Sequence, residues 1–220
     1  LNLPTPTTVM TNQTETIRAL RGFAQEEGKD LSRRAAWQKL TKEHTFTTLA
    51  ASDQGAASIP DDFDWYKADT MFNRTRRRAV VGPLDDELWQ QIQASLTTLV
   101  DPGFRFRGGT ILITPTPPAG QTVAYEYTSN QWCESEAGTD QSEWMADTDV
   151  PILEPELFIL GLVWRFRKAK ALSYDEDFST YERAVLDRMM KDGAKPRLSG
   201  DSARHDRIPR PPRVPDTLVF

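Results

Sequence analysis

The sequence has one cysteine and two histidines among its 220 residues. A lone Cys133 excludes an internal disulfide framework and a cysteine-based zinc site, and it fits a reducing compartment. His44 and His205 are too few for a histidine-rich metal site, and neither has the sequence context of a catalytic triad. We expect Cys133, which follows Trp132, to be a partly buried inert thiol and His44 to be an ordinary sheet residue.

Long hydrophobic runs are also missing. No apolar stretch reaches the ~18 residues of a membrane-spanning helix, and the longest lies around residues 157–164. The glycine-rich phosphate loops, the nucleophile elbow and the zinc-protease helix motif do not occur. These absences predict a non-membrane protein without obvious enzyme chemistry and without a cofactor or metal.

Charge is acidic overall and unevenly distributed. Lys and Arg number 27 against 32 Asp and Glu, a net charge of −5, which argues against a nucleic-acid coat or a basic membrane-surface protein. Residues 195–220 carry a net charge of +3 and five prolines, so the rest of the chain carries −8. This segment cannot build a core, and polyproline geometry would let it lie across a partner surface.

Helical periodicity appears at both ends of the chain. Asn12 and Glu15 have the spacing of a capping box, and apolar residues follow at helical spacing from Ile17 to Ala35. Gly28 weakens the middle of this segment, so one long helix and two helices meeting near residues 28–30 are both open. Two further helices are predicted from about Glu154 and from Tyr174 to Met190, the second ending at Gly193.

Between these helices the pattern is that of strands. Strands are predicted at residues 45–49, 63–72, 104–113 and 123–127, and Gly108-Gly109 predicts a two-residue hairpin within the third. One helix is predicted from Asp86 to about Leu99, with Asp85 as its N-cap. Its expected apolar stripe consists of Leu88, Ile92, Leu96 and Leu99. Residues 129–152 are expected to be irregular.

These patterns predict an α+β fold, in which N- and C-terminal helices form a bundle, with a β-rich inserted part like a barrel or sandwich and an extended C-terminal arm. The predicted segments are 1–42 (N-terminal helical), 43–130 (β-rich insert with one helix), 131–194 (loop and C-terminal helices) and 195–220 (Pro/Arg-rich arm).

Three groups of residues are candidates for function. Asp147 and Asp149 could serve a metal or act as a base, but their spacing before Pro151 is more typical of turn and helix capping. The densest cluster of positive charge, at residues 74–78, could contact phosphates or an acidic partner. A solvated turn whose arginines pair with neighbouring carboxylates is the simpler interpretation. We name the members of this cluster as candidate contacts to an acidic partner: Arg74, Arg76, Arg77 and Arg78. The arm supplies charge and an apolar anchor through Arg204, Arg207, Arg210, Arg213 and Phe220.

A series of short motifs, taken in order, resembles the head-to-tail adaptors (portal adaptors or head-completion proteins) of tailed bacteriophages, in particular short-tailed phages. The resemblance covers about residues 1–200, and its specificity comes from the ordered combination. The matching pieces are Glu26-Glu27-Gly28, Arg33-Arg34, Trp37 to Leu40, Thr45 to Thr48, Pro60 to Phe63, Asn73-Arg74-Thr75, Gly82-Pro83-Leu84, Trp89-Gln90, Phe106 to Gly109, Tyr125-Glu126-Tyr127, Trp144 to Asp149, Leu160 to Phe166, Lys168 to Leu172 with Tyr174, and Tyr181-Glu182.

The resemblance implies structural work in the virion neck, after assembly in the host cytoplasm. Such adaptors bind the portal after DNA packaging, usually as a ring of twelve, close the head, and form both the platform for the tail and the conduit for genome ejection. The implied partners are the portal, neighbouring copies, tail nozzle or fibre proteins, and DNA that passes without specific contacts. The implied fold sets a helical bundle against the portal and a β-rich part toward the tail, with no active site; the arm residues then become candidate contacts to the portal or a neighbouring subunit.

Two other classes stay open from the residues. A nucleic-acid-binding regulatory protein would rest on the arginine cluster and the arm, against the acidic net charge and the lack of a recognition-helix pattern. A carboxylate-dependent hydrolase would rest on Asp147 and Asp149.

Overall fold

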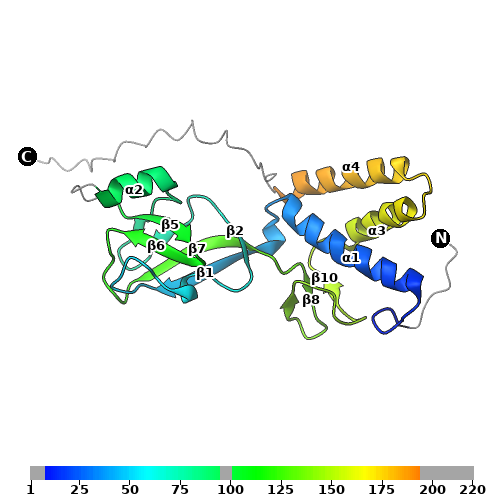
Figure 1. The fold of residues 1–220 in the computed structure, drawn as a ribbon, viewed down its shortest axis with the longest axis horizontal. Helices are drawn as coiled ribbons and strands as arrows, with labels where there is room; N and C mark the ends of the chain where they lie inside the picture. The colour runs from blue at the N-terminus through cyan, green and yellow to red at the C-terminus, as the bar shows by residue number, and fades with distance from the viewer. Residues whose placement is uncertain (1–7, 95–100, 194–220) are drawn as a thin grey trace, which may run out of the picture.

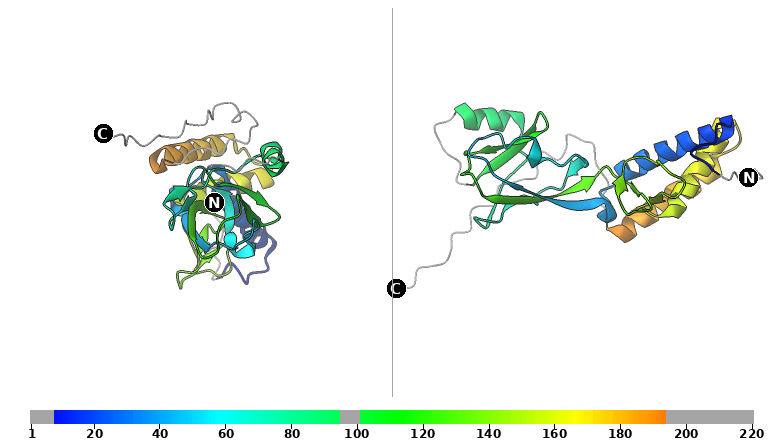
Figure 2. Two further views of the ribbon diagram at one scale, coloured as in Figure 1. Left: turned by 90° about the vertical axis from the view of Figure 1, so that its left-hand side faces the viewer. Right: turned by 90° about the horizontal axis from the view of Figure 1, so that it is seen from below.

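The computed structural model describes residues 8–94 and 101–193. Within these ranges the chain forms an elongated α+β molecule, with helices at one end and a β-rich body at the other (Figure 1). The view from below shows the same separation (Figure 2). The predicted mixed fold and the packing of N- and C-terminal helices against each other are confirmed.

Three helices make up the helical end: α1 (Glu15–Arg34), α3 (Pro155–Ala169) and α4 (Asp175–Asp192). Helix α3 packs against both of the others. Their shared core contains mainly large apolar side chains, namely Leu31, Trp37, Leu40, Trp132, Leu153, Leu157, Phe158, Tyr181, Val185 and Met189. Helix α4 ends as predicted at Gly193, which adopts φ +68°.

Helix α1 is one continuous helix, and it begins later than predicted. The capping box does not form, because Asn12 Oδ1 accepts a hydrogen bond from Thr14 N at 2.9 Å in a turn before the helix. Gly28 does not interrupt α1. It is buried against the indole of Trp132, where a Cβ atom would overlap the ring. The glycine therefore permits a close approach to Trp132.

The β-rich body is built around β7 (Thr122–Ser129), in which residues 122–128 pair antiparallel with every residue of β1 (Thr41–Thr47). The sheet order is β1-β7-β3-β4. Strand β2 also pairs with β7, near its C-terminal end, whereas β3 pairs near its N-terminal end. The short strands are β2 (Phe63–Tyr66), β3 (Phe72–Asn73) and β4 (Arg78–Ala79). The 3₁₀ helices η1 (Gln38–Leu40) and η2 (Ala56–Ser58) precede and follow β1.

A hairpin of β5 (Gly103–Arg107) and β6 (Thr110–Thr114) shares one apolar core with this sheet. Gly108 and Gly109 both have positive φ, as the predicted two-residue turn requires. The core is dominated by aromatic and β-branched side chains: Phe46, Tyr66, Met71, Val80, Phe104, Ile111, Ile113, Val123, Tyr125 and Tyr127.

Helix α2 (Asp86–Ala94) begins as predicted, with Asp85 Oδ1 accepting from Leu88 N at 2.7 Å. Its expected apolar stripe is wrong at Leu88, which is exposed, while Trp89 is buried. The rest of the predicted helix, including Leu96 and Leu99, lies outside the described residues.

Two further expectations need correction. The strand predicted at residues 63–72 is divided into β2 and β3 by a turn, in which Thr70 Oγ1 donates to Lys67 O at 2.7 Å and Asp69 has φ +63°. Residues 129–152 are not simply irregular. They form a small antiparallel sheet of β8 (Cys133–Glu134), β9 (Asp140–Gln141) and β10 (Val150–Pro151).

A polar cluster ties the small sheet to the larger one. Lys42 Nζ lies 2.8 Å from Asp62 Oδ2 and 2.7 Å from Asp140 Oδ2. Asp62 also accepts hydrogen bonds from the Tyr127 hydroxyl at 2.7 Å and the Ser129 hydroxyl at 2.8 Å. Burial opposes ionisation of Asp62, but Lys42 and the two hydroxyls outweigh it and lower the pKa of this carboxyl. The Asp62 carboxyl is therefore held in its charged form at neutral pH.

We predict opposite effects for alanine at two glycines of α1. Gly28→Ala should lower the free energy of unfolding by about 1–3 kcal/mol, because the new methyl group overpacks the Trp132 contact. Gly22→Ala is the matched control: nothing lies within 4 Å of its Cβ position, so better helix propensity should stabilise the protein by up to ~1 kcal/mol. Urea denaturation of both variants measures this. Equal effects of the two substitutions would contradict the close approach.

Candidate functional site

The arginine cluster lies on the turn that joins β3 and β4. Asn73 pairs with Arg78 across this hairpin, and Arg77 adopts φ +55° within the turn. The turn is fastened to the start of β7, since Arg74 N donates to Thr122 O at 2.8 Å and Thr122 N donates to Thr75 Oγ1 at 2.9 Å. The cluster thus sits where β1 ends and β7 begins, at the end of the β-rich body away from the helices.

The four arginines do not act as one patch. Arg74 Nη2 lies 2.5 Å from Glu43 Oε2, and Arg78 Nη2 lies 2.9 Å from Asp101 Oδ1. All four side chains of these two pairs are about half exposed, so each pair contributes at most ~1 kcal/mol. For Arg74 and Arg78 the expected solvated turn paired with carboxylates is confirmed. Arg76 and Arg77 form no ion pair with any residue in the described ranges.

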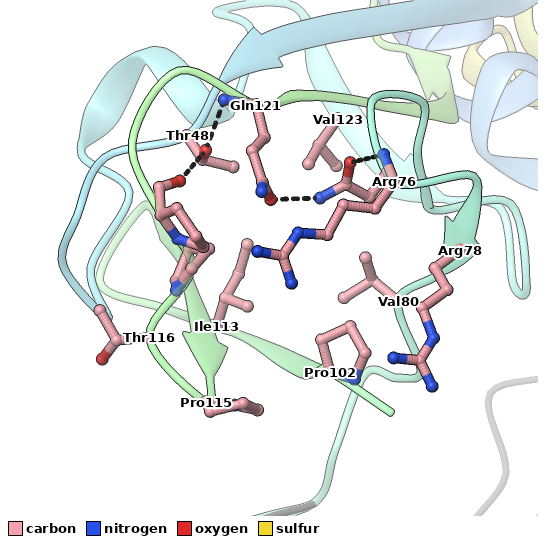
Figure 3. A pocket seen from close by; sticks show the side chains of 13 residues that line it. Thr48, Arg76, Arg78, Val80, Pro102, Ile113, Pro115, Thr116, Gln121 and Val123 are labelled. Atoms are coloured by element: carbon pink, nitrogen blue, oxygen red, sulfur yellow. Dashed lines mark hydrogen bonds between the residues drawn. The ribbon is translucent and has the colours of Figure 1, made fainter. Parts of the chain in front are cut away.

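The side chain of Arg76 extends into a pocket with a volume of about 160 Å³ (Figure 3). One wall is the β6–β7 loop, which Thr48 holds in place. Thr48 Oγ1 donates to Pro118 O at 2.7 Å and accepts from Gln121 N at 3.0 Å. The pocket therefore has a fixed wall. Its lining contains two arginines and no Asp or Glu, and consists of Thr48, Asn73, Arg76, Arg78, Val80, Pro102, Ile113, Pro115, Thr116, Pro117, Pro118, Gln121 and Val123.

Asp147 and Asp149 bind separate sets of backbone donors. Asp149 Oδ2 accepts from Met145 N at 2.6 Å and from Ala146 N at 2.8 Å, which is the predicted capping of a turn. Asp147 Oδ1 accepts from Val9 N at 3.0 Å and Met10 N at 2.8 Å. The pair therefore fastens a turn and the N-terminal segment.

The remaining reactive side chains have structural surroundings. Cys133 is fully buried, and burial raises the pKa of its thiol to about 12, with nearby Asp149 adding to the shift, so an inert thiol is confirmed. His44 lies in β1 with Nε2 3.0 Å from Ala57 O, as an ordinary sheet residue. Among the residues that the structure describes, no three His, Cys, Asp or Glu side chains converge to hold a metal ion. His205 and the arm candidates Arg204, Arg207, Arg210, Arg213 and Phe220 lie outside the described residues.

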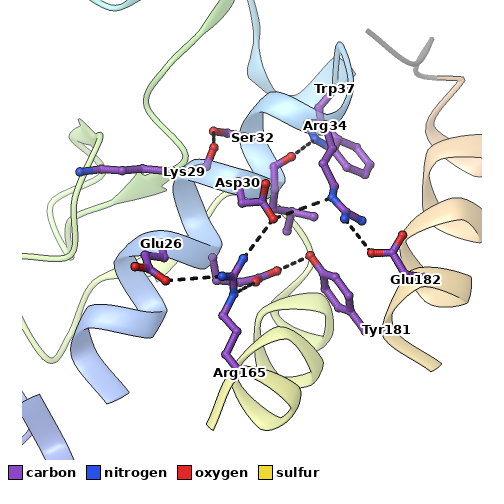
Figure 4. Close-up of polar contacts among 11 residues, drawn as sticks. Glu26, Lys29, Asp30, Ser32, Arg34, Trp37, Arg165, Tyr181 and Glu182 are labelled. Carbon is purple, nitrogen blue, oxygen red and sulfur yellow. Dashed lines mark hydrogen bonds and ion pairs between the residues drawn. The ribbon is translucent and has the colours of Figure 1, made fainter. Parts of the chain in front are cut away.

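Sequence reasoning missed the most deeply buried charge of the helical end. Glu27 of α1 has no exposed surface. Its carboxylate accepts a hydrogen bond from Nε of Arg165, a residue of α3, at a distance of 2.7 Å (Figure 4). The hydroxyl of Tyr181, on α4, donates to the other oxygen of Glu27. Gly161 of α3 makes room for this carboxylate, because a Cβ atom there would overlap it. One side chain therefore joins all three helices.

A shell of further charges surrounds this contact. Arg165 Nη2 lies 3.0 Å from Asp30 Oδ2, and Arg34 Nη2 lies 2.6 Å from Glu182 Oε1. The Arg165 guanidinium stands 4.7 Å from the ring centre of Trp164. Burial beside the Glu27 carboxylate raises the pKa of the Tyr181 hydroxyl, so Tyr181 remains a hydrogen-bond donor throughout the physiological pH range.

One signal in the sequence could have revealed this network. Glu27 stands three residues after Ala24 and four before Leu31, on the same face that the apolar pattern assigns to the core. A carboxylate on a buried face needs a buried cation as its partner. Arg165, between Trp164 and Phe166 in the most apolar helical segment, is a cation expected to be buried, so it was the natural candidate.

Comparison with protein families decides among the classes left open. The family model of the SU10 adaptor protein matches residues 7–215, so it spans both the helical end and the β-rich body. The chain belongs to the SU10 adaptor protein family. Among curated proteins, no sequence matches this chain significantly.

The adaptor is accordingly a structural protein of a phage, with a head-to-tail role, and not an enzyme. Its residues Asp147 and Asp149 have the structural partners described above and need no catalytic role. Among its described residues, no helix is long and apolar enough to cross a membrane.

We predict that the buried contact of the adaptor is strongly coupled. Arg165→Met should lower the free energy of unfolding by about 3–5 kcal/mol, because it leaves the Glu27 carboxylate buried without its cation. Adding Glu27→Gln should recover part of the loss, so the double variant is more stable than the sum of the single effects.

Urea denaturation of the two single variants and the double variant measures this coupling. Glu26→Gln is the control, because Glu26 is 68% exposed and lies 3.5 Å from Arg165 Nη1, so its effect should be within about 0.5 kcal/mol of zero. Additive effects of the Glu27 and Arg165 substitutions would refute the network.

Proposed function

We propose that this adaptor binds the phage portal as a ring of copies, with twelve as the expected number, after DNA has been packaged. The ring closes the head, offers the platform on which the tail assembles, and serves as the conduit for genome ejection. The observation that carries the proposal is the family match from residue 7 to 215, which includes every described element from α1 to α4.

The two-ended shape supports a bridging role. We assign the helical end to the portal and the β-rich body to the tail, and we retain the four segments 1–42, 43–130, 131–194 and 195–220 as functional units. A protein with its two bodies at opposite ends of a long axis can contact two partners at once (Figure 2). The proposed tail-side partners are nozzle or fibre proteins.

Exposed apolar side chains on the helices support contacts between copies. Ile159 of α3 is 61% exposed, and Leu186 and Met190 of α4 are 56% and 76% exposed. Leu186 and Met190 are four residues apart, so they share one helix face. Ring subunits make heterologous contacts, in which one flank of a copy binds a different flank of the next. These side chains are our candidates for such a flank.

Charge supports the remaining assignments. DNA passing through the ring would be repelled by an acidic lumen and would not adhere to it, and the chain is acidic apart from residues 195–220. We propose that Asp and Glu line the channel and that the arginines of residues 74–78 point away from the DNA. The basic arm, with Arg204, Arg207, Arg210, Arg213 and Phe220, is proposed to lie along the portal or a neighbouring copy. Assembly is proposed to occur in the host cytoplasm, and the final location is the virion neck.

An assembly experiment tests this function. Purified protein should be monomeric by light scattering, because weak contacts between copies avoid premature rings, and it should form multi-copy complexes when purified portal is added. Ile159→Lys should reduce the number of copies retained on the portal, while Leu49→Lys, at an exposed apolar residue of the β-rich body, should not.

Two variants examine the arm in the same assay. Deletion of residues 195–220 should leave the melting temperature of the free subunit nearly unchanged and weaken portal binding. A full-length variant with glutamine at the four arm arginines shows whether their charge, and not only the length of the arm, contributes to portal binding. Stable rings without portal, or no binding to portal, would contradict the proposed assembly; unaltered binding of the truncated chain would contradict the role of the arm alone.

A further inference from the structure

Several hydrogen-bond donors meet at the base of the pocket beside the arginine turn. Asn73 and Gln121 are 6% and 8% exposed and meet at its base. With its amide oxygen toward Asn73, Gln121 accepts from Nδ2 at 2.8 Å. With the oxygen turned toward Arg76, it accepts from Nε at 2.6 Å and Nη2 at 3.3 Å. Asn73 Oδ1 already accepts from Arg76 N, and one Gln121 oxygen cannot accept from both sides. In either orientation one N–H of this cluster therefore has no acceptor among the side chains that meet here.

Part of the wall of this pocket is apolar. Val80, Ile113 and Val123 are almost fully buried beneath it, and the β6–β7 loop contributes prolines that have no N–H group. Arg78 lies at the side and is already paired with Asp101, whereas the guanidinium of Arg76 stands in the pocket (Figure 3). The site therefore combines a cation that has no ion pair within residues 8–94 and 101–193, an amide donor without a side-chain acceptor, and an apolar surface.

We infer that this pocket binds a carboxylate side chain, together with the apolar side chain next to it, from an extended acidic segment of the tail-side partner. A guanidinium fork matches a carboxylate in two parallel hydrogen bonds, and the carboxylate accepts from that amide donor as well. The volume of about 160 Å³ is well below that of typical pockets for small molecules and cofactors, so it admits one or two side chains. The identity of the partner rests on the proposed function; the chemistry of the pocket does not.

A nucleic acid fits these observations less well. Phosphate recognition draws on several cations arranged along a backbone, and here Arg74 and Arg78 are already paired with Glu43 and Asp101. A sugar–phosphate chain would leave the apolar part of the wall unused. A carboxylate attached to an apolar peptide uses both parts of the pocket.

Titration with blocked peptides tests this chemistry on the full chain by ¹H–¹⁵N correlation spectra. Acetyl-Leu-Asp-Leu-amide should shift the amide signals of Thr48, Thr116 and Gln121, and acetyl-Leu-Asn-Leu-amide should bind at least fivefold more weakly. Sodium acetate and the oligonucleotide dT6 are the competing ligands. Equal binding of the Asn peptide, or tighter binding of acetate or dT6 at these residues, would overturn the inference.

Matched variants show whether Arg76 is responsible. Arg76→Gln should weaken binding of the Asp peptide at least fivefold, whereas Arg74→Gln, with the same change in charge on the same turn, should leave it within twofold. Unchanged spectra of the unliganded variants outside the turn show that the fold is kept. Equal losses in both variants would indicate a general charge effect and would overturn the assignment to the pocket.

A reconstitution experiment separates this inference from the proposed function. Heads that carry portal but lack adaptor are incubated with each variant and then with tails. Arg76→Gln should bind heads normally and reduce tail attachment, while Arg74→Gln should match the natural chain in both steps. If the natural chain fails to bind heads, the proposed function fails; if Arg76→Gln supports full tail attachment, only the pocket inference fails.

Discussion

The helical end depends on the contacts that the buried carboxylate of Glu27 makes. This carboxylate has no exposed surface, it pairs with Arg165 of α3, and it accepts from Tyr181 of α4, so it needs side chains from both C-terminal helices. The β-rich body is inserted in the chain between α1 and these helices. This contact therefore holds the N-terminal helix α1 against the C-terminal helices α3 and α4. It also sets where the chain enters the β-rich body after α1 and where it returns to the helices after β7.

Buried charge of this kind favours one arrangement over many. An apolar interface could slide or rotate at small cost, whereas displacement of α3 by one turn would separate Arg165 from Glu27 and leave this buried carboxylate without its cation. Gly161 and Gly28 add a steric requirement, because each lies where only a glycine lets the neighbouring group approach. For an adaptor between two large assemblies, a rigid unit transmits a defined orientation from one to the other.

Local signals account for what could be predicted from the sequence. The Gly108-Gly109 hairpin, the Asp85 cap and the end of α4 at Gly193 each depend on a few adjacent residues, and each is found in the structure. The division of residues 63–72 depends on the pairing of β2 and β3 with β7, which lies far along the chain. The sheet within residues 129–152 pairs nearby segments, but its strands have two residues each, too few to give an alternating pattern.

The site follows the same rule. The sequence marks the arginine cluster, but the separation of Arg76 from Arg74 and Arg78 depends on Gln121, Glu43 and Asp101, which come from other strands and loops. Glu27 was missed because its partners lie on helices far along the chain. The family resemblance, in contrast, was accessible from ordered motifs alone, and the family match agrees with it.

We propose that in the virion the helical end faces the portal and the β-rich body, with the Arg76 pocket, faces the tail. A cryo-EM map of the neck of the assembled virion tests it most directly. The account predicts a ring of this chain between portal and tail, with α1, α3 and α4 on the portal side and the pocket in contact with tail density. A map with the β-rich body against the portal, or without this chain in the neck, would contradict it.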